Sequence, residues 1–214
     1  SGVFDLQGNS EVLAGNFELM IGPTNAADVV IGSGGVLTPN VNTTIFTVGT
    51  ANPSGVTISG GAFALQIFGT IAAAGTRTLQ VNDGAAGNDL TITSAIVDGT
   101  GLQSVGIVKT GFGTLELGGA SDNTNTGDTT VNEGTLLLNK GTGSGGVRAM
   151  SGRLYVGDNT VTSGYSGADV VRWLQPEQLP DYASLVDLRT TWFVDLNGFN
   201  ETIGNVDGQT GLTL

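Results

Sequence analysis

A short phrase occurs twice in this chain, and it restricts the fold more than any other feature. Residues 113–117 read GTLEL and residues 134–138 read GTLLL, so the two copies start 21 residues apart (134 − 113). Each copy joins a glycine, a β-branched residue and alternating leucines, and Asn, Thr, Asp and Gly fill the interval. A fixed period of about 20 residues that holds one strand and its turns is typical of a β-solenoid. We therefore predict that successive coils of the chain stack on one another.

Short apolar runs recur along the whole sequence, and turn sequences such as Gly34-Gly35, Asn52-Pro53 and Asn197-Gly198 separate them. We expect strands within residues 17–21, 29–31, 44–48, 56–58, 63–68, 78–81, 90–92, 106–108, 114–117, 136–138, 153–156, 170–174, 185–188, 193–196 and 202–206. At roughly 20 residues per coil, the chain would form about ten coils and a column of roughly 50 Å.

The composition agrees with an all-β chain that has a filled core. Only 12% of the residues are charged and 39% are hydrophobic, which is unlike a disordered segment. An immunoglobulin-like sandwich would also give regular short strands. The repeated phrase and the many Asn, Thr and Gly residues between strands favour a parallel β-solenoid that takes in residues 1–214 as a single unit. Because the chain stops within an apparent strand at 211–214, we expect it to be a piece of something longer.

The charge and the missing residue types exclude several functions. The net charge of −12 leaves no Lys/Arg cluster for nucleic acid, so we expect no nucleic-acid partner. No apolar run is long enough to span a membrane, so we expect no direct membrane insertion. Histidine and cysteine are both absent, which rules out the usual catalytic triads and zinc sites. The acidic residues are spread along the chain, and we predict no catalytic residues, no metal site and no cofactor.

One acidic stretch has the spacing of a calcium-binding loop. Six of its residues fall at the ligand and glycine positions of an EF-hand, namely Asp122, Thr124, Thr126, Gly127, Asp128 and Glu133. An EF-hand requires flanking helices, whereas residues 129–138 have the pattern of strands. We therefore interpret this spacing as a coincidence.

One segment interrupts the glycine-rich pattern. Residues 173–182 contain two prolines, a tryptophan and a tyrosine but no glycine. This composition suggests a protruding loop, in which Trp173, Tyr182 and the nearby Trp192 would contact a ligand. The alternative is a longer turn whose aromatic side chains pack on the solenoid.

The stretch that contains the repeated phrase resembles the autotransporter-associated β-strand repeat. Residues 106–139 give the best match, and the positions that carry it are Lys109, Gly111, Gly113, Thr114, Leu115, Leu117, Gly119, Gly127, Thr129, Val131, Gly134, Thr135 and Leu136. Asn125 stands where the family usually has an aromatic residue. Looser similarity extends from about residue 77 to residue 206.

The resemblance implies a right-handed parallel β-helix in the passenger region of a large secreted or cell-surface bacterial protein. In that family an outer-membrane barrel usually exports the passenger, which is type V secretion. We therefore expect a non-catalytic, structural or adhesive segment of a larger surface protein, located outside the cell or on its surface. The alternative is a β-helix that binds or cleaves polysaccharides.

Several partners follow from this interpretation. Neighbouring coils of the same parent chain would cover the ends of the segment, and host or surface glycans or proteins would be its ligands. Uncovered strand edges would also favour end-to-end self-association.

Overall fold

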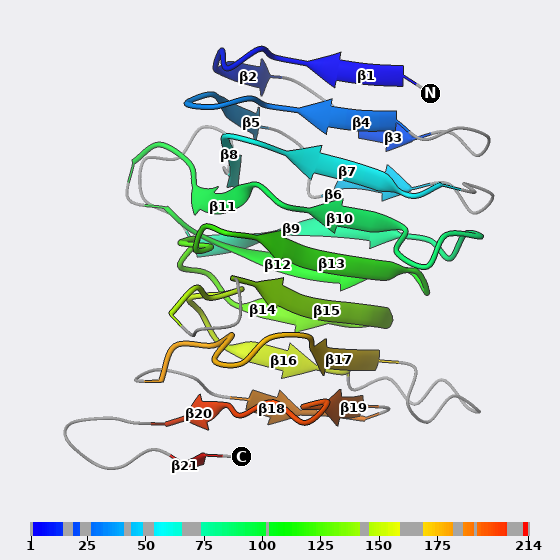
Figure 1. The fold of residues 1–214 in the computed structure, drawn as a ribbon, viewed down its shortest axis with the longest axis vertical. Helices are drawn as coiled ribbons and strands as arrows, with labels where there is room; N and C mark the ends of the chain where they lie inside the picture. The colour runs from blue at the N-terminus through cyan, green and yellow to red at the C-terminus, as the bar shows by residue number, and fades with distance from the viewer. Residues whose placement is uncertain are drawn as a thin grey trace.

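The computed structural model describes residues 2–14, 19–21, 27–40, 44–48, 54–65, 74–101, 103–141, 146–158, 169–181, 186–190, 192–204 and 212–213. These residues contain strands, turns and loops and no helix. The coils lie one above another along the longest axis of the molecule, with the N-terminus at one end and the C-terminus at the other (Figure 1). The predicted all-β parallel solenoid is confirmed.

The largest sheet, here called face A, contributes one strand from every coil. Its strands pair in the order β1 (Gly2–Asp5), β4 (Ala27–Val30), β7 (Val56–Ser59), β10 (Leu90–Ile92), β13 (Thr114–Gly119), β15 (Gly134–Lys140), β17 (Asp169–Trp173) and β19 (Trp192–Asp195). All of these pairings are parallel. Parallel pairing excludes the sandwich of antiparallel sheets.

A second sheet, face C, runs behind face A. It pairs β3 (Leu19–Ile21), β6 (Thr44–Val48), β9 (Ala74–Val81), β12 (Ser104–Thr110), β14 (Thr129–Val131), β16 (Leu154–Val156) and β18 (Val186–Leu188) in that order, again in parallel. In Figure 1 the face A strands run leftwards at the front and the face C strands run rightwards behind them, while the chain descends. This winding is right-handed, as expected for parallel crossovers.

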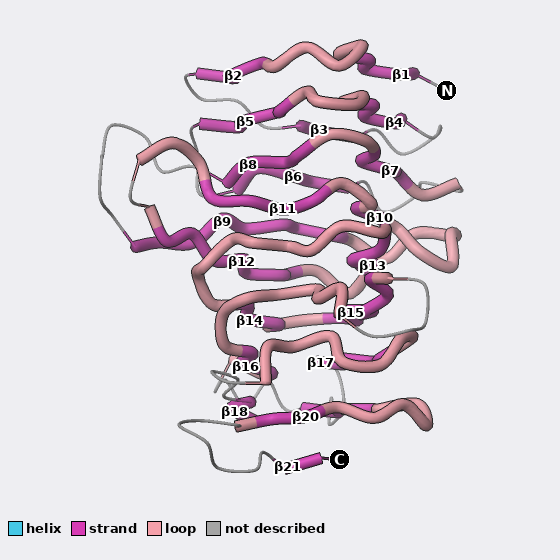
Figure 2. The backbone as a smooth tube through the Cα atoms, turned by 60° about the vertical axis from the view of Figure 1, so that its left-hand side comes forward, coloured by secondary structure: helices cyan, strands magenta, loops and turns pink. Residues whose placement is uncertain are grey.

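Face B lies on one side of the first four coils. It contains β2 (Glu11–Ala14), β5 (Val36–Asn40), β8 (Ala62–Leu65) and β11 (Ala95–Asp98), which pair in parallel. Below β11 this side of the column is made of loop segments (Figure 2). At the C-terminal end, β20 (Thr202–Ile203) and β21 (Leu212–Thr213) form a separate antiparallel pair.

The core consists of inward ladders in which each residue lies over its counterpart on the next coil. One ladder on face A, here called the Phe4–Trp173 ladder, connects Phe4, Val29, Ile58, Ile92, Leu117, Leu138 and Trp173. Every member except Phe4 is buried. Each coil therefore shields the apolar side chains of its neighbours, as the repeated phrase predicts.

The coils are longer and fewer than predicted. Leu115 pairs with Leu136, so this coil has the predicted 21 residues (136 − 115). Leu136 pairs with Val171, 35 residues further on (171 − 136). Within the described residues face A has eight strands, which corresponds to a column of roughly 34 Å at the usual strand spacing. These described strands are fewer than the predicted ten coils because some loops between strands are longer than those of the 21-residue coil.

Each strand segment predicted from the sequence overlaps a strand of the structure. The missed strands are β1, β2, β5 and β11. Three of these belong to face B, and β5 is buried on both sides over residues 37–39, so it lacks the alternation that marks a half-exposed strand.

Candidate functional site

A lysine lies within an aliphatic ladder of face C, in the coil that contains the repeated phrase. Lys109 is flanked by Leu79 on the coil above and Val131 on the coil below. Its side chain is fully buried. The Lys109 Nζ donates to the carbonyl oxygens of Gly111 at 2.6 Å and Glu133 at 2.8 Å, with a longer bond of 3.4 Å to Thr110. The lysine thus ties its own corner, from face C to face A, to the corner of the next coil.

The environment of Lys109 changes its ionisation. Burial lowers the pKa of Lys109 to about 7, although the negative charges of Glu133, Asp89 and Asp169 oppose this shift. The Glu133 Oε2 accepts a hydrogen bond from the backbone N–H of Gly111 at 2.6 Å. Glu133 therefore stabilises the corner through both its carbonyl and its carboxylate.

The glycine of this corner is required by its geometry. Gly111 has φ of +78°, and a Cβ at this position would lie 2.4 Å from the carbonyl oxygen of Val81. A residue with a side chain would be strained here and would also clash with the coil above. The Lys-x-Gly spacing of the sequence thus describes one structural unit.

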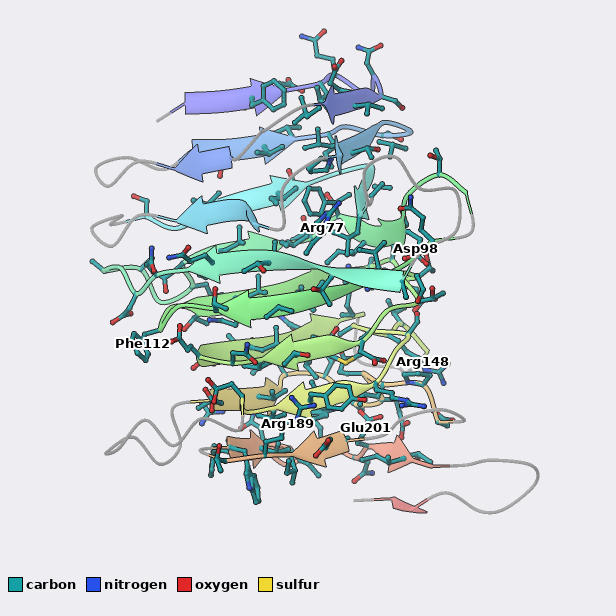
Figure 3. All side chains as sticks on the ribbon, turned by 180° about the vertical axis from the view of Figure 1, so that it is seen from behind. Arg77, Asp98, Phe112, Arg148, Arg189 and Glu201 are labelled. Atoms are coloured by element: carbon teal, nitrogen blue, oxygen red, sulfur yellow. The ribbon has the colours of Figure 1, made fainter. Side chains whose placement is uncertain are left out.

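A second buried polar network joins the lower coils. Lys140 is buried, and its backbone N–H donates to the Oε1 of Gln178 at 2.8 Å, while the Gln178 Nε2 donates back to the carbonyl of Lys140 at 3.0 Å. Burial lowers the pKa of Lys140 to about 8, against the charge of Asp122. The buried Glu201, labelled in Figure 3, accepts hydrogen bonds from the Trp173 Nε1 at 2.6 Å and from the Gln178 N–H at 2.7 Å. Burial raises the pKa of Glu201 despite these bonds.

Two asparagines replace strand pairing where face B gives way to loop. The Asn123 Oδ1 accepts from the Ile96 N–H at 2.8 Å, and its Nδ2 donates to the Ala149 carbonyl at 2.7 Å on the next coil. The Asn125 Nδ2 donates to the Val105 carbonyl at 3.2 Å. Both side chains are buried. They satisfy backbone groups that would otherwise lack partners in the core.

Carboxylates serve the backbone of neighbouring coils in a similar way. The Asp89 oxygens accept from Gly84 and Thr114, each at 2.8 Å. Asp98 accepts from the Val105 N–H at 3.0 Å and from the Thr126 N–H at 2.9 Å. These groups cap backbone N–H donors and do not converge on a common point.

The acidic residues with the spacing of a calcium-binding loop also accept hydrogen bonds from backbone N–H groups. Asp122 accepts from the backbone N–H of Arg148 at 2.6 Å, and Asp128 accepts from that of Arg153 at 3.0 Å. Within the described residues, no group of three or more acidic side chains could hold a metal ion.

One shallow groove lies on the outer side of face C. Its volume is about 330 Å³, and it is lined by Ala74, Gly75, Thr76, Ser104, Thr126, Gly127 and Asp128. This lining has no aromatic or basic side chain with which to grip a ligand.

Two of the three aromatic residues predicted to contact a ligand, Trp173 and Trp192, lie in different environments. Trp173 is 1% exposed at the lower end of the Phe4–Trp173 ladder, whereas Trp192 on the next strand of face A is 46% exposed. Tyr182 lies outside the described residues. The expected protrusion is not found in residues 173–181, because Gln178 and Leu179 are fully buried against the core. Trp173 instead packs in the interior, which is the alternative considered from the sequence.

The basic residues are distributed unevenly along the column. The three that precede residue 141, namely Arg77, Lys109 and Lys140, are all buried. The four others lie on the lower coils, and three of them form ion pairs: Arg148–Asp181 at 2.9 Å, Arg172–Asp195 at 2.8 Å and Arg189–Asp187 at 3.7 Å. Arg189 also stacks over the ring of Tyr155, 4.5 Å from its centroid. The outer surface of the upper coils therefore carries acidic side chains without basic ones.

Comparison with known proteins gives a match in the stretch that contains Lys109. Residues 107–138 match the family model described as a passenger-associated-transport repeat. This stretch extends from β12 through β13 and β14 into β15, and so covers one complete coil. The wider similarity predicted for residues 77–206 is outside this match and stays a prediction.

No curated protein and no solved structure matches the chain at a significant level. Among the described residues, no helix has the length and apolarity needed to cross a membrane. The match over residues 107–138 confirms the predicted resemblance to an autotransporter passenger repeat, and the chain is a parallel β-helix in which this stretch is similar to the passenger-associated-transport repeat.

Proposed function

We propose that this chain is a non-catalytic structural segment of a bacterial autotransporter passenger, which acts outside the cell or on its surface as a stiff scaffold. The observation that carries the proposal is the position of the family repeat, which forms a middle coil of a continuous stack. Coils above and below it would belong to the same parent chain. An adhesive role would then depend on ligands that bind the outer faces or loops of the scaffold.

The interior supports a scaffold role. The inward ladders are apolar and continuous, and the buried polar groups of Lys109, Asn123 and Glu201 bond to groups on adjacent coils. Contacts of this kind resist separation of the coils, because breaking them would leave buried donors and acceptors unsatisfied. A stack stabilised in this way suits a rod that holds other parts of a protein away from a surface.

The placement of the acidic residues supports the absence of catalysis. Polysaccharide cleavage by carboxylates requires two of them on either side of one bond. Asp89, Asp98, Asp122 and Asp128 are instead engaged with backbone N–H groups at separate corners.

A polysaccharide-binding role is the alternative, and the exposed rings of Trp192 and Phe193 favour it. Flat aromatic surfaces of this kind can stack on sugars. Binding to a glycan array that is lost in Trp192→Ala, but kept in Phe112→Ala, would support this alternative.

Removal of one whole coil tests the scaffold proposal. Leu115 pairs with Leu136, so deletion of residues 115–135 would place Thr114 directly before Leu136. The inward residues of face A and of face C would then stay in register with those of the neighbouring coils. A scaffold should still fold, with a lower melting temperature, and the parent protein should still reach the cell surface, where external protease can digest it. The matched control deletes residues 115–125, which is about half a coil and places the following strands on the wrong face.

The two deletions make the proposal falsifiable. Circular dichroism and protease treatment of intact cells should show a folded, surface-exposed product for the whole-coil deletion and neither property for the control. Intracellular retention of the intact parent protein, or a specific glycosidase activity abolished by the whole-coil deletion, would overturn the proposal.

A further inference from the structure

A band of polar side chains crosses four coils on the outer side of face C, the side that Figure 3 turns toward the reader. Its upper part is the shallow groove described above, whose lining offers the hydroxyls of Thr76, Ser104 and Thr126 and the carboxylate of Asp128. Its lower part begins at Arg153 on the next coil, whose backbone N–H donates to the Asp128 Oδ1 at 3.0 Å. The band therefore extends over three coil steps, roughly 14 Å at the usual strand spacing.

The lower part of the band supplies the aromatic and basic side chains that the groove lacks. Tyr155 lies between two buried residues of β16, Leu154 and Val156, and its own side chain points outward. The Arg153 side chain hydrogen-bonds to that of Tyr155, and Arg189 of the following coil stacks over the Tyr155 ring, 4.5 Å from its centroid. These contacts restrict the orientation of the ring and of the Arg153 guanidinium before any ligand binds. The band, here called the outer band, consists of Thr76, Ser104, Thr126, Asp128, Arg153 and Tyr155.

Several polar groups of the outer band have no hydrogen-bond partner among the described residues. These groups are the side-chain hydroxyls of Thr76 and Ser104 and the Oδ2 of Asp128, whose Oδ1 is the atom that accepts from Arg153. Arg153 is exposed and belongs to none of the three ion pairs in the described part of the chain. The outer band therefore presents both donors and acceptors to solvent. This combination suits the hydroxyl groups of a sugar, each of which donates and accepts.

The charges and the low apolar content of the outer band argue against other kinds of partner. The carboxylate of Asp128 lies beside Arg153 and balances its charge. Asp187 likewise lies 3.7 Å from Arg189. With no surplus of positive charge here and a net charge of −12, the column would repel a polyanion. Among the described residues that line the groove, Ala74 is the single apolar side chain, so an apolar peptide or a lipid chain would find no anchor there.

We propose that the outer band binds a strand of an uncharged polysaccharide, which lies parallel to the long axis of the column. Sugar hydroxyls bond to Thr76, Ser104 and Asp128 in the groove. The strand then continues over Arg153 and Tyr155 on the next coil. The inference rests on the proposed function, because it supplies a ligand for the outer face of the scaffold.

Isothermal titration calorimetry of the purified 214-residue chain with neutral hexasaccharides of glucose, mannose, galactose and xylose tests this site. At least one hexasaccharide should bind. The disaccharide of the same sugar should bind more weakly, because it is too short to reach both Thr76 and Arg153. Arg153→Gln should weaken binding of the hexasaccharide by about tenfold, as expected for the loss of a charged hydrogen bond. Thr76→Val removes a neutral hydroxyl and should weaken binding by about threefold.

The matched controls are Arg172→Gln and Thr91→Val, which remove the same groups from the outer side of face A and should leave the affinity unchanged. Far-ultraviolet circular dichroism should show that all four variants keep the fold. The proposal would be overturned if no neutral hexasaccharide binds, if a galacturonate hexasaccharide alone binds, or if Arg153→Gln lowers the affinity no more than Arg172→Gln does. Loss of binding in Trp192→Ala with full binding by Arg153→Gln would also overturn it, because the ligand would then lie on β19. Surface display of the coil-deletion protein is independent of these results, so failure of the site and failure of the scaffold role are distinguishable.

Discussion

The Lys140 Nζ donates to the carbonyl oxygen of Ser94 at 3.0 Å, although the two residues are 46 positions apart in the sequence. Lys140 pairs in register with Gly119 on the coil above it, and Gly119 in turn lies against Thr93 on the coil above that. The lysine side chain therefore spans two coil steps, past a position that has no side chain of its own. Gly119 and Lys140 together form one contact that links three coils, and this contact is here called the Gly119–Lys140 link.

Replacement of Gly119 should test the Gly119–Lys140 link directly. Gly119 has φ of +93°, and a Cβ there would lie 2.2 Å from the Thr93 carbonyl oxygen. We expect Gly119→Ala to lower the free energy of unfolding by about 1–3 kcal/mol, because the backbone must shift at a strained position. Urea denaturation measures this change. Gly87→Ala is the control, since a Cβ at Gly87 meets no atom within 4 Å, and a similar loss in both variants would contradict the explanation.

The buried Lys109 should contribute more to stability than Lys140. Lys109→Met would leave the carbonyl oxygens of Gly111 and Glu133 without the donors that they have at 2.6 and 2.8 Å. Loss of bonds to buried acceptors should cost about 1–3 kcal/mol. Lys140→Met removes the side-chain hydrogen bond to the Ser94 carbonyl and should lower the free energy of unfolding by less. Urea denaturation of both variants checks this order, and a more stable Lys109→Met protein would refute it.

The same lysines should make stability depend on pH. The folded protein loses the proton of Lys109 near pH 7, whereas the unfolded chain keeps it until about pH 10.5. Within this window the unfolded state binds more protons, so the free energy of unfolding should rise with pH, by at most about 1.4 kcal/mol per pH unit. Lys140 should add to the rise above about pH 8. Urea denaturation across this range should give a smaller slope for Lys109→Met than for the wild type, and equal slopes would contradict the assignment.

The two tryptophans should differ in their access to solvent. Trp173 is 1% exposed and bonded to Glu201, whereas Trp192 is 46% exposed. In acrylamide quenching of intrinsic fluorescence, Trp192→Phe should leave only a protected signal, and Trp173→Phe should leave only a quenchable one. Strong quenching of the remaining tryptophan in Trp192→Phe would show that Trp173 lies on the surface.

The repeated phrase predicted the stacked coils because its period of 21 residues is the length of one coil. Leu115 and Leu136 occupy equivalent places in GTLEL and GTLLL, and they lie in register on adjacent strands. The 21-residue spacing could not be extended to the other coils. A ladder requires only that each strand lies in register with the strand of the previous coil, whatever the length of the loops between them. The loops between Leu136 and Val171 add residues without changing the register.

The buried polar groups could not be found from residue type alone. A lysine in a glycine-rich repeat is expected at the surface, and only its place between Leu79 and Val131 shows that it points inward. Asn125 stands where the family has an aromatic residue, yet it is buried and bonds the Val105 carbonyl, so its polarity is used for a backbone contact. The prolines and aromatic residues of residues 173–182 suggest either a ligand-contact loop or packing on the solenoid for Trp173, and its pairing with Leu138 places it in the ladder. A partner on an adjacent coil, distant along the chain, decides each of these cases.

The burial of every basic side chain before residue 141 has a consequence for digestion by trypsin, which cuts after lysine and arginine. In the native chain, Arg77, Lys109 and Lys140 are buried in the core. The first peptide bonds to be cleaved should therefore be those that follow the arginines between residues 148 and 189. Limited digestion should therefore release a large N-terminal fragment whose own cleavage sites open only when the coils separate.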